Sequence, residues 1–288
     1  MLISPYFLLY IVFSLFPILF SFVISFTDWN GFSKMTYIGL SNYNRLFFHD
    51  PTFYQSLYNT ALIMVFAIPL EIVTGLTLAA ILKDFFNRTR NLFQLVNFLP
   101  YITTPVAIGI LFQTLFDWKL GTVNMILVKL GLLKAPLYWL GLMWGSRAVV
   151  ILLLFWRTFG YVMVMFLAGL SSIPDELYEA AKIDGAKWKD SFFKITIPML
   201  KPIMTFVVIT GIINGFRLFD EPQLLFQAEG QPMGGPEHAV LTVVMNFYQA
   251  AFKNFEFGYG SAIAYGLFIV IFIFSYLSMK MMNRRDQI

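Results

Sequence analysis

The sequence predicts an all-α fold, a polytopic membrane bundle of six transmembrane helices. Of its 288 residues, 58% are hydrophobic and only 12% are charged, and the mean hydropathy is +0.71. A soluble domain carries charge on about a quarter of its residues, so a water-soluble globular protein is excluded. The apolar residues fall in long blocks, and residues 1–26 contain no charged side chain. At about 1.5 Å per residue, such a block crosses roughly 30 Å of hydrocarbon as a helix.

Five further apolar windows follow the first and are expected to form one transmembrane domain over residues 1–288. Backbone amides in lipid must be bonded within the chain, so each window is interpreted as a helix. A β-barrel would alternate apolar and polar residues, and the run from Ile269 to Phe274 does not. The six windows are about 1–26, 58–82, 96–116, 148–169, 202–219 and 258–279.

The first window is expected to be retained in the mature protein. No basic residue precedes it, and bulky Phe26 and Trp29 follow Ser25 where a signal-peptide cleavage site needs small residues.

The distribution of basic residues predicts the orientation. If the N-terminus is cytoplasmic, the cytoplasmic segments are 83–95, 170–201 and 280–288, and the outer segments are 27–57, 117–147 and 220–257. The cytoplasmic segments hold 11 Lys and Arg residues in 54 positions, and the outer segments hold seven in 100. Because Lys and Arg concentrate in cytoplasmic loops, both termini are predicted to be cytoplasmic.

Several classes of chemistry find no support in the sequence. The chain has no cysteine, which excludes disulfides and cysteine metal sites, and its two histidines, His49 and His238, are too scattered to suggest a metal cluster. It has no Gly-x-x-x-x-Gly-Lys-Ser/Thr loop for nucleotide phosphates and no nucleophile–base pair. We therefore expect no catalytic residue, no metal and no cofactor on this chain. The net charge of +4 needs no nucleic acid partner.

The segment 170–201 does not read as a simple linker. Ser172 and Asp175 have the spacing of a capping box, Pro174 suits a first helical turn, and Gly185 is placed to end a helix of about ten residues. Such a helix is too short to be stable alone, so it should dock against its own bundle or against a partner. Its apolar stripe would be Leu177, Tyr178, Ala181 and Ile183.

One string in this segment resembles a known motif. Glu179-Ala180-Ala181-x-x-Asp184-Gly185-Ala186, followed by Ile195-x-x-Pro198, looks like the EAA loop of the inner-membrane permeases of ABC importers. Gly234-Gly235-Pro236, the segment from Tyr248 to Ala262, and Leu99-Pro100 resemble sugar-importer permeases similar to the larger subunit of the maltose and glycerol-phosphate systems. The resemblance covers nearly the whole chain. It implies a type I ABC importer permease fold in the inner (cytoplasmic) membrane of a prokaryote.

The resemblance also implies a function and a set of partners. The chain would be a permease subunit that moves a sugar, a disaccharide or oligosaccharide, into the cytoplasm by alternating access. Its partners would be a second permease, two cytoplasmic ATPase subunits that bind ATP and Mg, and an extracytoplasmic solute-binding protein. The coupling residues toward the ATPase would be Glu179, Ala180, Ala181, Asp184, Gly185, Ala186 and Pro198.

Two alternative functions remain open at this point. A permease for glycerol phosphate or another small polar solute would use Arg157 as an anion clamp. An ion-driven secondary carrier is less favoured, because Glu71 is the only acid deep in a predicted span.

Three charged residues lie inside the predicted spans, namely Glu71, Arg157 and Arg217. Charges at this depth are costly and are usually paired or functional. Glu71 and Arg157 either pair with each other, or Arg157 faces a cavity where its guanidinium holds sugar hydroxyls or a carboxylate. Arg217 has acids at i+3 and i+4, Asp220 and Glu221, so a local ion pair is predicted there.

In maltose-type permeases, sugar contacts come from the spans just before and just after the EAA loop. The resemblance therefore points to a substrate path made of Trp156, Arg157, Thr158, Tyr161, Gly211, Asn214, Gly215 and Leu218. Aromatic faces that stack on pyranose rings, with an amide nearby, suit Trp156, Tyr161 and Asn214. The alternative for each residue is helix packing, and Gly211 and Gly215 have the small-xxx-small spacing that favours close helix contact.

Overall fold

The computed structural model describes residues 4–85, 89–226 and 232–283, and helices make up most of these residues. The prediction of an all-α fold is confirmed. The elements before the first long loop are α1 (Ser4–Tyr10), the π-helical turn η1 (Ile11–Leu15), α2 (Phe16–Ile24), the short strands β1 (Thr27–Asp28) and β2 (Thr36–Tyr37), α3 (Ser41–Asn44), the π-helical turn η2 (Arg45–His49) and α4 (Pro51–Phe85). The central elements are α5 (Arg90–Ile102), α6 (Pro105–Leu115), α7 (Thr122–Lys129), the 3₁₀ turn η3 (Trp139–Gly141) and α8 (Met143–Ser171). The remaining elements are α9 (Asp175–Ile183), α10 (Trp188–Ser191), the π-helical turn η4 (Phe192–Thr196), α11 (Ile197–Met199), α12 (Lys201–Phe216), α13 (Asp220–Leu225), the 3₁₀ turn η5 (Pro236–His238), α14 (Val243–Tyr248), the π-helical turn η6 (Gln249–Lys253) and α15 (Phe257–Asn283).

Four helical stretches are each long and apolar enough to cross a membrane: Ser4–Ile24, Pro51–Lys83, Met143–Ser171 and Phe257–Met281. They overlap the first, second, fourth and sixth windows of the sequence. The first stretch exposes nearly all of its side chains, including Phe13 at 73%. Apolar side chains exposed along a whole helix are what lipid contact requires, and the chain is thus a multi-pass membrane protein.

The third window is not the single helix that the sequence predicts. Helices α5 and α6 meet at a bend of 94°. Thr103 and Thr104 adopt extended backbone conformations, and α6 begins at Pro105. Proline disfavours the helical conformation for the residue before it, which explains the break. The Thr104 hydroxyl accepts a hydrogen bond from the backbone N–H of Ala107 at 3.4 Å, so the new helix is capped where it starts.

The fifth window also belongs to a bent pair. The segment Trp188–Met199 and helix α12 meet at 60°, with Leu200 between them. Pro202 lies in the first turn of α12, where its missing N–H costs no helical hydrogen bond. If each bent pair counts as one span, the described chain has up to six spans.

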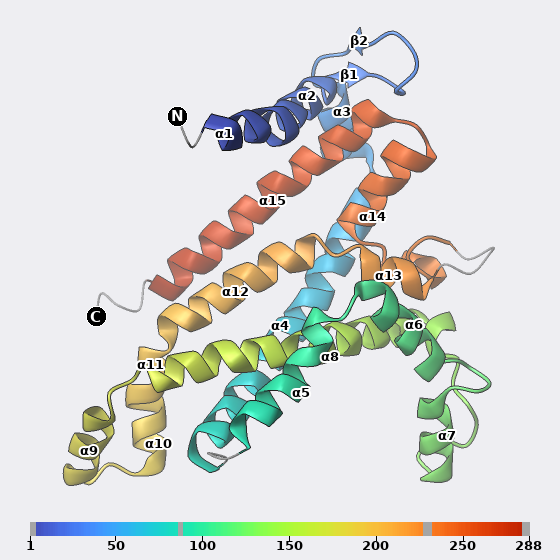
Figure 1. The fold of residues 1–288 in the computed structure, drawn as a ribbon. Coiled ribbons are helices and arrows are strands. Elements are labelled where there is room, and N and C mark those ends of the chain that lie inside the picture. Colours follow the sequence, from blue (N-terminus) through green and yellow to red (C-terminus); the bar gives the residue numbers. More distant parts are fainter. Residues whose placement is uncertain (1–3, 86–88, 227–231, 284–288) are drawn as a thin grey trace.

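Figure 1 shows how these helices are arranged. Helices α4 and α8 cross in extensive contact at the centre, α5 packs on α8, and α12 packs on both α4 and α15. Helix α2 packs on α15 at one side of the bundle. Helices α9 and α10 project from the end of the molecule where α1 begins and α15 finishes. The short helix α9 thus extends beyond the long helices at one end of the bundle.

Three apolar clusters hold the bundle together. The first joins α6, α8 and α13, the second joins α4, α8 and α12 near the projecting helices, and the third joins α4, α12, α14 and α15. Phe112, Phe166 and Phe216 are buried members of the first, second and third clusters. Because α4, α8 and α12 each belong to more than one cluster, packing fixes their positions relative to one another. A cavity lies between these three helices.

At the opposite end of the bundle, a buried arginine on a long helix binds the loop around residues 237–239 through hydrogen bonds. Arg147 on α8 is 6% exposed and donates to the carbonyl of Ala239 at 3.0 Å and to Oδ1 of Asn59 on α4 at 2.8 Å. Asn59 in turn donates to the carbonyl of His238 at 2.7 Å. Glu237 and His238 both have positive φ angles, 53° and 55°, which non-glycine residues rarely adopt. The Arg147–Asn59 pair therefore holds a strained turn in place.

Candidate functional site

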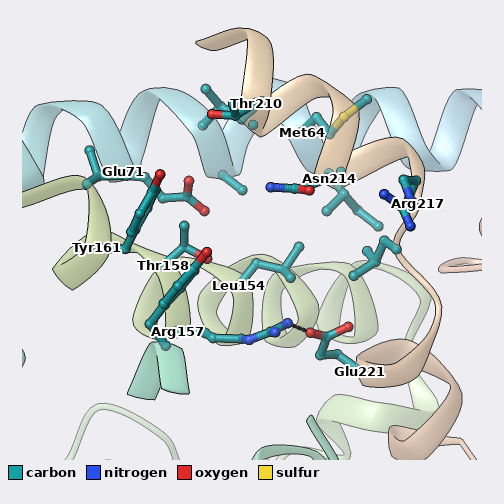
Figure 2. A pocket seen from close by; sticks show the side chains of 18 of the residues that line it. Met64, Glu71, Leu154, Arg157, Thr158, Tyr161, Thr210, Asn214, Arg217 and Glu221 are labelled. Carbon is teal, nitrogen blue, oxygen red and sulfur yellow. Dashed lines mark ion pairs between the residues drawn. The ribbon is translucent and has the colours of Figure 1, made fainter. Parts of the chain in front are cut away.

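A cavity of about 380 Å³ lies between α4, α8 and α12 (Figure 2). Its volume falls within the range of small-molecule binding sites, roughly 300–1,000 Å³. Helix α5 contributes Tyr101, and the segment after α12 contributes residues 217–221. The three helices supply most of the lining: Ile63, Met64, Ala67, Ile68 and Glu71 from α4, Leu154, Arg157, Thr158, Tyr161 and Val162 from α8, and Val207, Thr210, Gly211, Asn214 and Gly215 from α12.

On α4, the lining residues Met64, Ile68 and Glu71 are spaced four and three apart, which places them on one face of the helix. Glu71 is 7% exposed, and its carboxylate points into the cavity (Figure 2). The structure gives this carboxylate no ion pair and no hydrogen bond with any of the residues that it describes. Glu71 therefore presents an unpartnered acceptor to whatever enters.

On α8, the pairing that the sequence left open is resolved. Arg157 does not pair with Glu71 but forms an ion pair with Glu221 of α13, a residue that is 3% exposed. Arg157 still lines the cavity, as the second alternative proposed. One turn further, Tyr161 stacks on Tyr101 of α5, with the ring centroids 4.6 Å apart.

The sequence predicts a local ion pair of Arg217 with Asp220 and Glu221. This prediction is wrong for Glu221, which pairs with Arg157 instead. Among the described residues, Arg217 forms no ion pair. The i+3 and i+4 spacing brings side chains together only on one continuous helix. Here α12 ends at Phe216, and α13 begins only at Asp220. Arg217 instead lines the cavity at the end away from Glu71 (Figure 2).

On α12, Thr210 and Asn214 face the cavity, and each directly precedes one glycine of the predicted small-xxx-small pair. A Cβ atom on Gly215 would collide with the side chain of Met64, and one on Gly211 would lie 3.3 Å from Ile68. The glycines thus allow α12 to approach α4 closely, as the packing interpretation expects, and they also line the cavity.

Of the remaining residues predicted for the substrate path, two line the cavity and one does not. Leu218 and Thr158 line the cavity. Trp156 does not: it packs against the first apolar cluster, with its ring 5.8 Å from that of Phe112. Trp156 precedes Arg157 by one residue, and neighbours on a helix point about 100° apart, so the two cannot both face the cavity squarely.

Sequence reasoning missed Tyr101, Thr210 and Met64, and it assigned Glu221 to the wrong partner. Thr210 and Met64 could have been found by extending the helix faces that contain Asn214 and Glu71 by one or two turns. Tyr101 reaches the cavity because the bend at Thr103 turns α5 across α8, and no pattern within its own window reveals that position.

The lining has a definite polarity. One end holds the Glu71 carboxylate with the hydroxyls of Thr158 and Tyr161, and the other holds the Arg217 guanidinium and the Arg157–Glu221 pair (Figure 2). The Asn214 amide lies between them, beside apolar side chains such as Leu154. Hydrogen-bond donors and acceptors distributed along the cavity suit a small polyhydroxylated ligand.

A second candidate region is the projecting helix α9. It ends just before Gly185, as the sequence predicts, and Gly185 has a φ of +77°. The N–H of Ala186 donates to the Ala181 carbonyl at 2.9 Å, and the N–H of Gly185 donates to the Lys182 carbonyl at 3.1 Å. These two bonds form a Schellman motif, which closes the helix end.

The predicted capping box at the start of α9 is wrong. Pro174 occupies the N-cap position in an extended conformation. The hydroxyl of Ser172 donates to the carbonyl of Gly169 at 2.8 Å, because Ser172 caps the end of α8 rather than the start of α9.

Helix α9 is attached to the bundle along one side only. Tyr178 bonds Thr196 at 2.9 Å through their hydroxyls, and Lys83 lies 3.9 Å from Asp175. The opposite side is open: Ile183 is 87% exposed, and Trp188, just beyond the loop, is 71% exposed. Of the predicted coupling residues, Glu179, Ala180, Asp184, Gly185 and Pro198 are exposed, and Ala181 and Ala186 are half-buried.

Residues 71–285 match the family described as binding-protein-dependent transport system inner membrane component. The chain is 37% identical to the arabinooligosaccharides transport system permease protein AraP of Bacillus subtilis (strain 168), over 96% of this chain and 86% of the relative. It is 35% identical to the lactose transport system permease protein LacF of Rhizobium radiobacter, over 96% and 90%. A chain of the bacterial alginate ABC transporter, crystallised with an alginate pentasaccharide-bound periplasmic protein, has the same fold, with a TM-score of 0.84, 20% identity and coverage of 99% and 94%.

Proposed function

Since this chain belongs to the family of binding-protein-dependent transport system inner membrane components, we propose that it moves a disaccharide or oligosaccharide into the cytoplasm as one permease subunit of an ATP-driven importer. The cavity between α4, α8 and α12 carries this proposal, because its carboxylate, hydroxyls, amide and guanidinium match the hydroxyl-rich surface of a sugar. Its relatives AraP and LacF are permeases of arabinooligosaccharide and lactose systems, which favours the same substrate class.

We assign α9 to the cytoplasmic side of the membrane. The segment 170–201 is rich in basic residues, and so is the chain after position 280. The start of α1 and the end of α15 lie at the same end of the bundle as α9 (Figure 1). Both termini are therefore cytoplasmic, and the Arg147-fastened turn faces the outside, where an extracytoplasmic binding protein delivers the sugar.

Helix α9 couples transport to ATP. Two cytoplasmic ATPase subunits hold ATP and Mg, and one of them receives α9 in a groove. The exposed Ile183 supplies apolar contact, and Glu179 and Asp184 supply carboxylates for charge-assisted hydrogen bonds with the partner. Gly185 and Ala186 close the helix and direct the chain back toward α12, so a displacement of α9 is transmitted to the wall of the cavity.

A second permease subunit completes the pathway. In the alternating-access cycle, closure of the ATPases moves α9 and the bent segment 188–216, and α12 shifts against α4 where Gly211 and Gly215 allow close approach. The cavity then opens outward, accepts sugar from the binding protein, and returns inward after ATP hydrolysis.

A phosphate ester is disfavoured as the substrate. Arg157, which would clamp an anion, is already neutralised by Glu221. The cavity also contains Asp220, whose negative charge opposes a phosphate. A neutral saccharide meets neither obstacle.

The test is reconstitution of the permease with its second permease, ATPases and binding protein in liposomes. Labelled oligosaccharide should accumulate inside only when ATP is supplied on the side of α9. Uptake driven by an ion gradient without the ATPase would contradict the proposal.

A further inference from the structure

One buried carboxyl group of the cavity has no protein partner among the described residues. Glu71 is more than nine-tenths buried, and its carboxylate is aimed into the cavity (Figure 2). A carboxylate in such a place is costly unless donors satisfy it. Arg157 could have satisfied it but is held by Glu221 instead. A ligand that carries hydrogen-bond donors would satisfy it.

The surroundings of Glu71 show which donors fit. Thr158 and Tyr161, from α8, lie at the same end of the cavity and carry hydroxyls that can both donate and accept (Figure 2). Tyr161 is held in place by its stack on Tyr101. A carboxyl group presents two oxygens and can bind two adjacent hydroxyls at once. Vicinal hydroxyls of a neutral sugar ring meet these requirements.

A sugar that carries its own carboxylate does not meet these requirements. Moving an ionised uronate into a buried site is costly unless a free cation pairs with it. A uronic acid unit at this end would bring its charge beside the acidic Glu71, with the Arg157 guanidinium already paired. The Arg217 guanidinium is at the opposite end (Figure 2).

We propose that Glu71 determines specificity: it binds adjacent hydroxyls of a neutral saccharide unit and excludes uronic acid units from the inner end of the cavity. This inference rests on the proposed function and assigns the substrate class of the same cavity. Saccharides such as the acidic polysaccharide alginate are accordingly poor substrates for this permease.

The first experiment uses the full complex in liposomes, with a neutral trisaccharide that the binding protein carries. Glu71→Gln should reduce ATP-driven uptake at least tenfold, since one of the two carboxyl oxygens that bind the hydroxyls is replaced by an amide nitrogen. Glu71→Asp, which keeps the carboxyl group, should restore at least a third of the wild-type rate. Val73→Ala is the matched control, because Val73 lies on the same helix but is 65% exposed. Uptake by the Val73→Ala variant should equal uptake by the wild type. ATP hydrolysis stimulated by the loaded binding protein should stay within twofold in all variants.

The second experiment needs no variant. In the purified wild-type complex, dicyclohexylcarbodiimide should modify Glu71, as read by mass spectrometry of the peptide. The neutral trisaccharide should slow this modification at least fivefold, and the same trisaccharide with one unit oxidised to a uronate should not.

The outcomes separate this inference from the proposed function. Wild-type uptake that Glu71→Gln leaves unchanged, or equal protection of Glu71 by both trisaccharides, would overturn the role of Glu71 and leave the sugar permease standing. Absence of ATP-driven uptake of every saccharide tested in the wild type would overturn the proposed function itself.

Discussion

Arg157 of α8 and Glu221 of α13 form an ion pair at the edge of the cavity, although the sequence places a closer basic residue, Arg217, beside Glu221. The pair joins a long helix to the short one that follows α12. Side-chain exposure is 26% for Arg157 and 4% for Glu221, so the pair is largely removed from water.

Removing one member of this pair should destabilise the protein. Glu221→Gln leaves the Arg157 charge partly buried without its partner, which costs about 3 kcal/mol. Thermal unfolding of the purified complex should show the loss as a lower midpoint. The double variant Arg157→Met with Glu221→Leu should unfold at a higher temperature than Glu221→Gln, because no charge remains uncompensated. Equal midpoints for Glu221→Gln and the wild type would show that the pair contributes nothing.

Gly185→Val should uncouple ATP hydrolysis from uptake. The positive φ of Gly185 costs a β-branched residue roughly 1–2 kcal/mol, so the turn after α9 would change shape. Uptake per ATP hydrolysed should fall, while the complex still binds sugar. Gly131→Val is the matched control, since Gly131 also has a positive φ and no atom within 4 Å of an added Cβ, but follows α7. Normal coupling in Gly185→Val would refute the assigned role.

Ile183→Ser should weaken binding of the ATPase subunits. Ile183 is 87% exposed, and burial of an isoleucine side chain contributes about 1.5–3 kcal/mol, which corresponds to a loss of affinity of about tenfold to a hundredfold. The measurement is titration of the permease pair with ATPase. Ile126→Ser on α7, where Ile126 is 51% exposed, should leave the affinity unchanged. A loss of the same size in both variants would point to a general effect on the fold.

Gly160→Ala should disrupt the contact between α5 and α8. An added Cβ would collide with the backbone carbonyl of Asn97, and backbone cannot turn aside as a side chain can. Overpacking of this kind costs about 1–3 kcal/mol. In Gly211→Ala the nearest atom is the end of the Ile68 side chain at 3.3 Å, so stability should stay within about 1 kcal/mol of the wild type. Unfolding midpoints in the reverse order would contradict the packing at Asn97.

Arg147→Gln should release the outer turn. Arg147 is buried and donates to Ala239 and Asn59, and hydrogen bonds from a charged group contribute about 1.5–3 kcal/mol each. Hydrogen exchange should therefore rise in residues 237–242. Arg45→Gln is the contrast, because the Arg45–Glu256 pair is exposed and contributes about 0–1 kcal/mol. Unchanged protection of the turn in Arg147→Gln would show that other contacts hold it.

Much of this fold is predictable from the sequence because lipid imposes one strong requirement on a spanning segment. The windows around Pro51–Lys83 and Met143–Ser171 are apolar, unbroken and helical, and the glycine after α9 ends that helix as expected. Thr104-Pro105 carried a signal for the break in the third window, but a count of apolar residues does not register a single bend.

The cavity was only partly predictable. Asn214 and Tyr161 lie on helix faces that the sequence can identify, and they do line it. The Arg157–Glu221 pair and the burial of Trp156 depend on how α13 and α6 pack on α8, and no spacing within one helix determines that. Long-range packing, rather than local pattern, decides which side chains meet there.

The bend between α5 and α6 also bears on how the protein is made. The two helices have 13 and 11 residues, so at about 1.5 Å per residue neither spans roughly 30 Å of hydrocarbon. A ribosome delivers them to the membrane before α8 and α13, the helices on which they pack. Their final placement has to wait for those later helices, so stable insertion of this part of the chain is a cooperative event that follows synthesis of the C-terminal half.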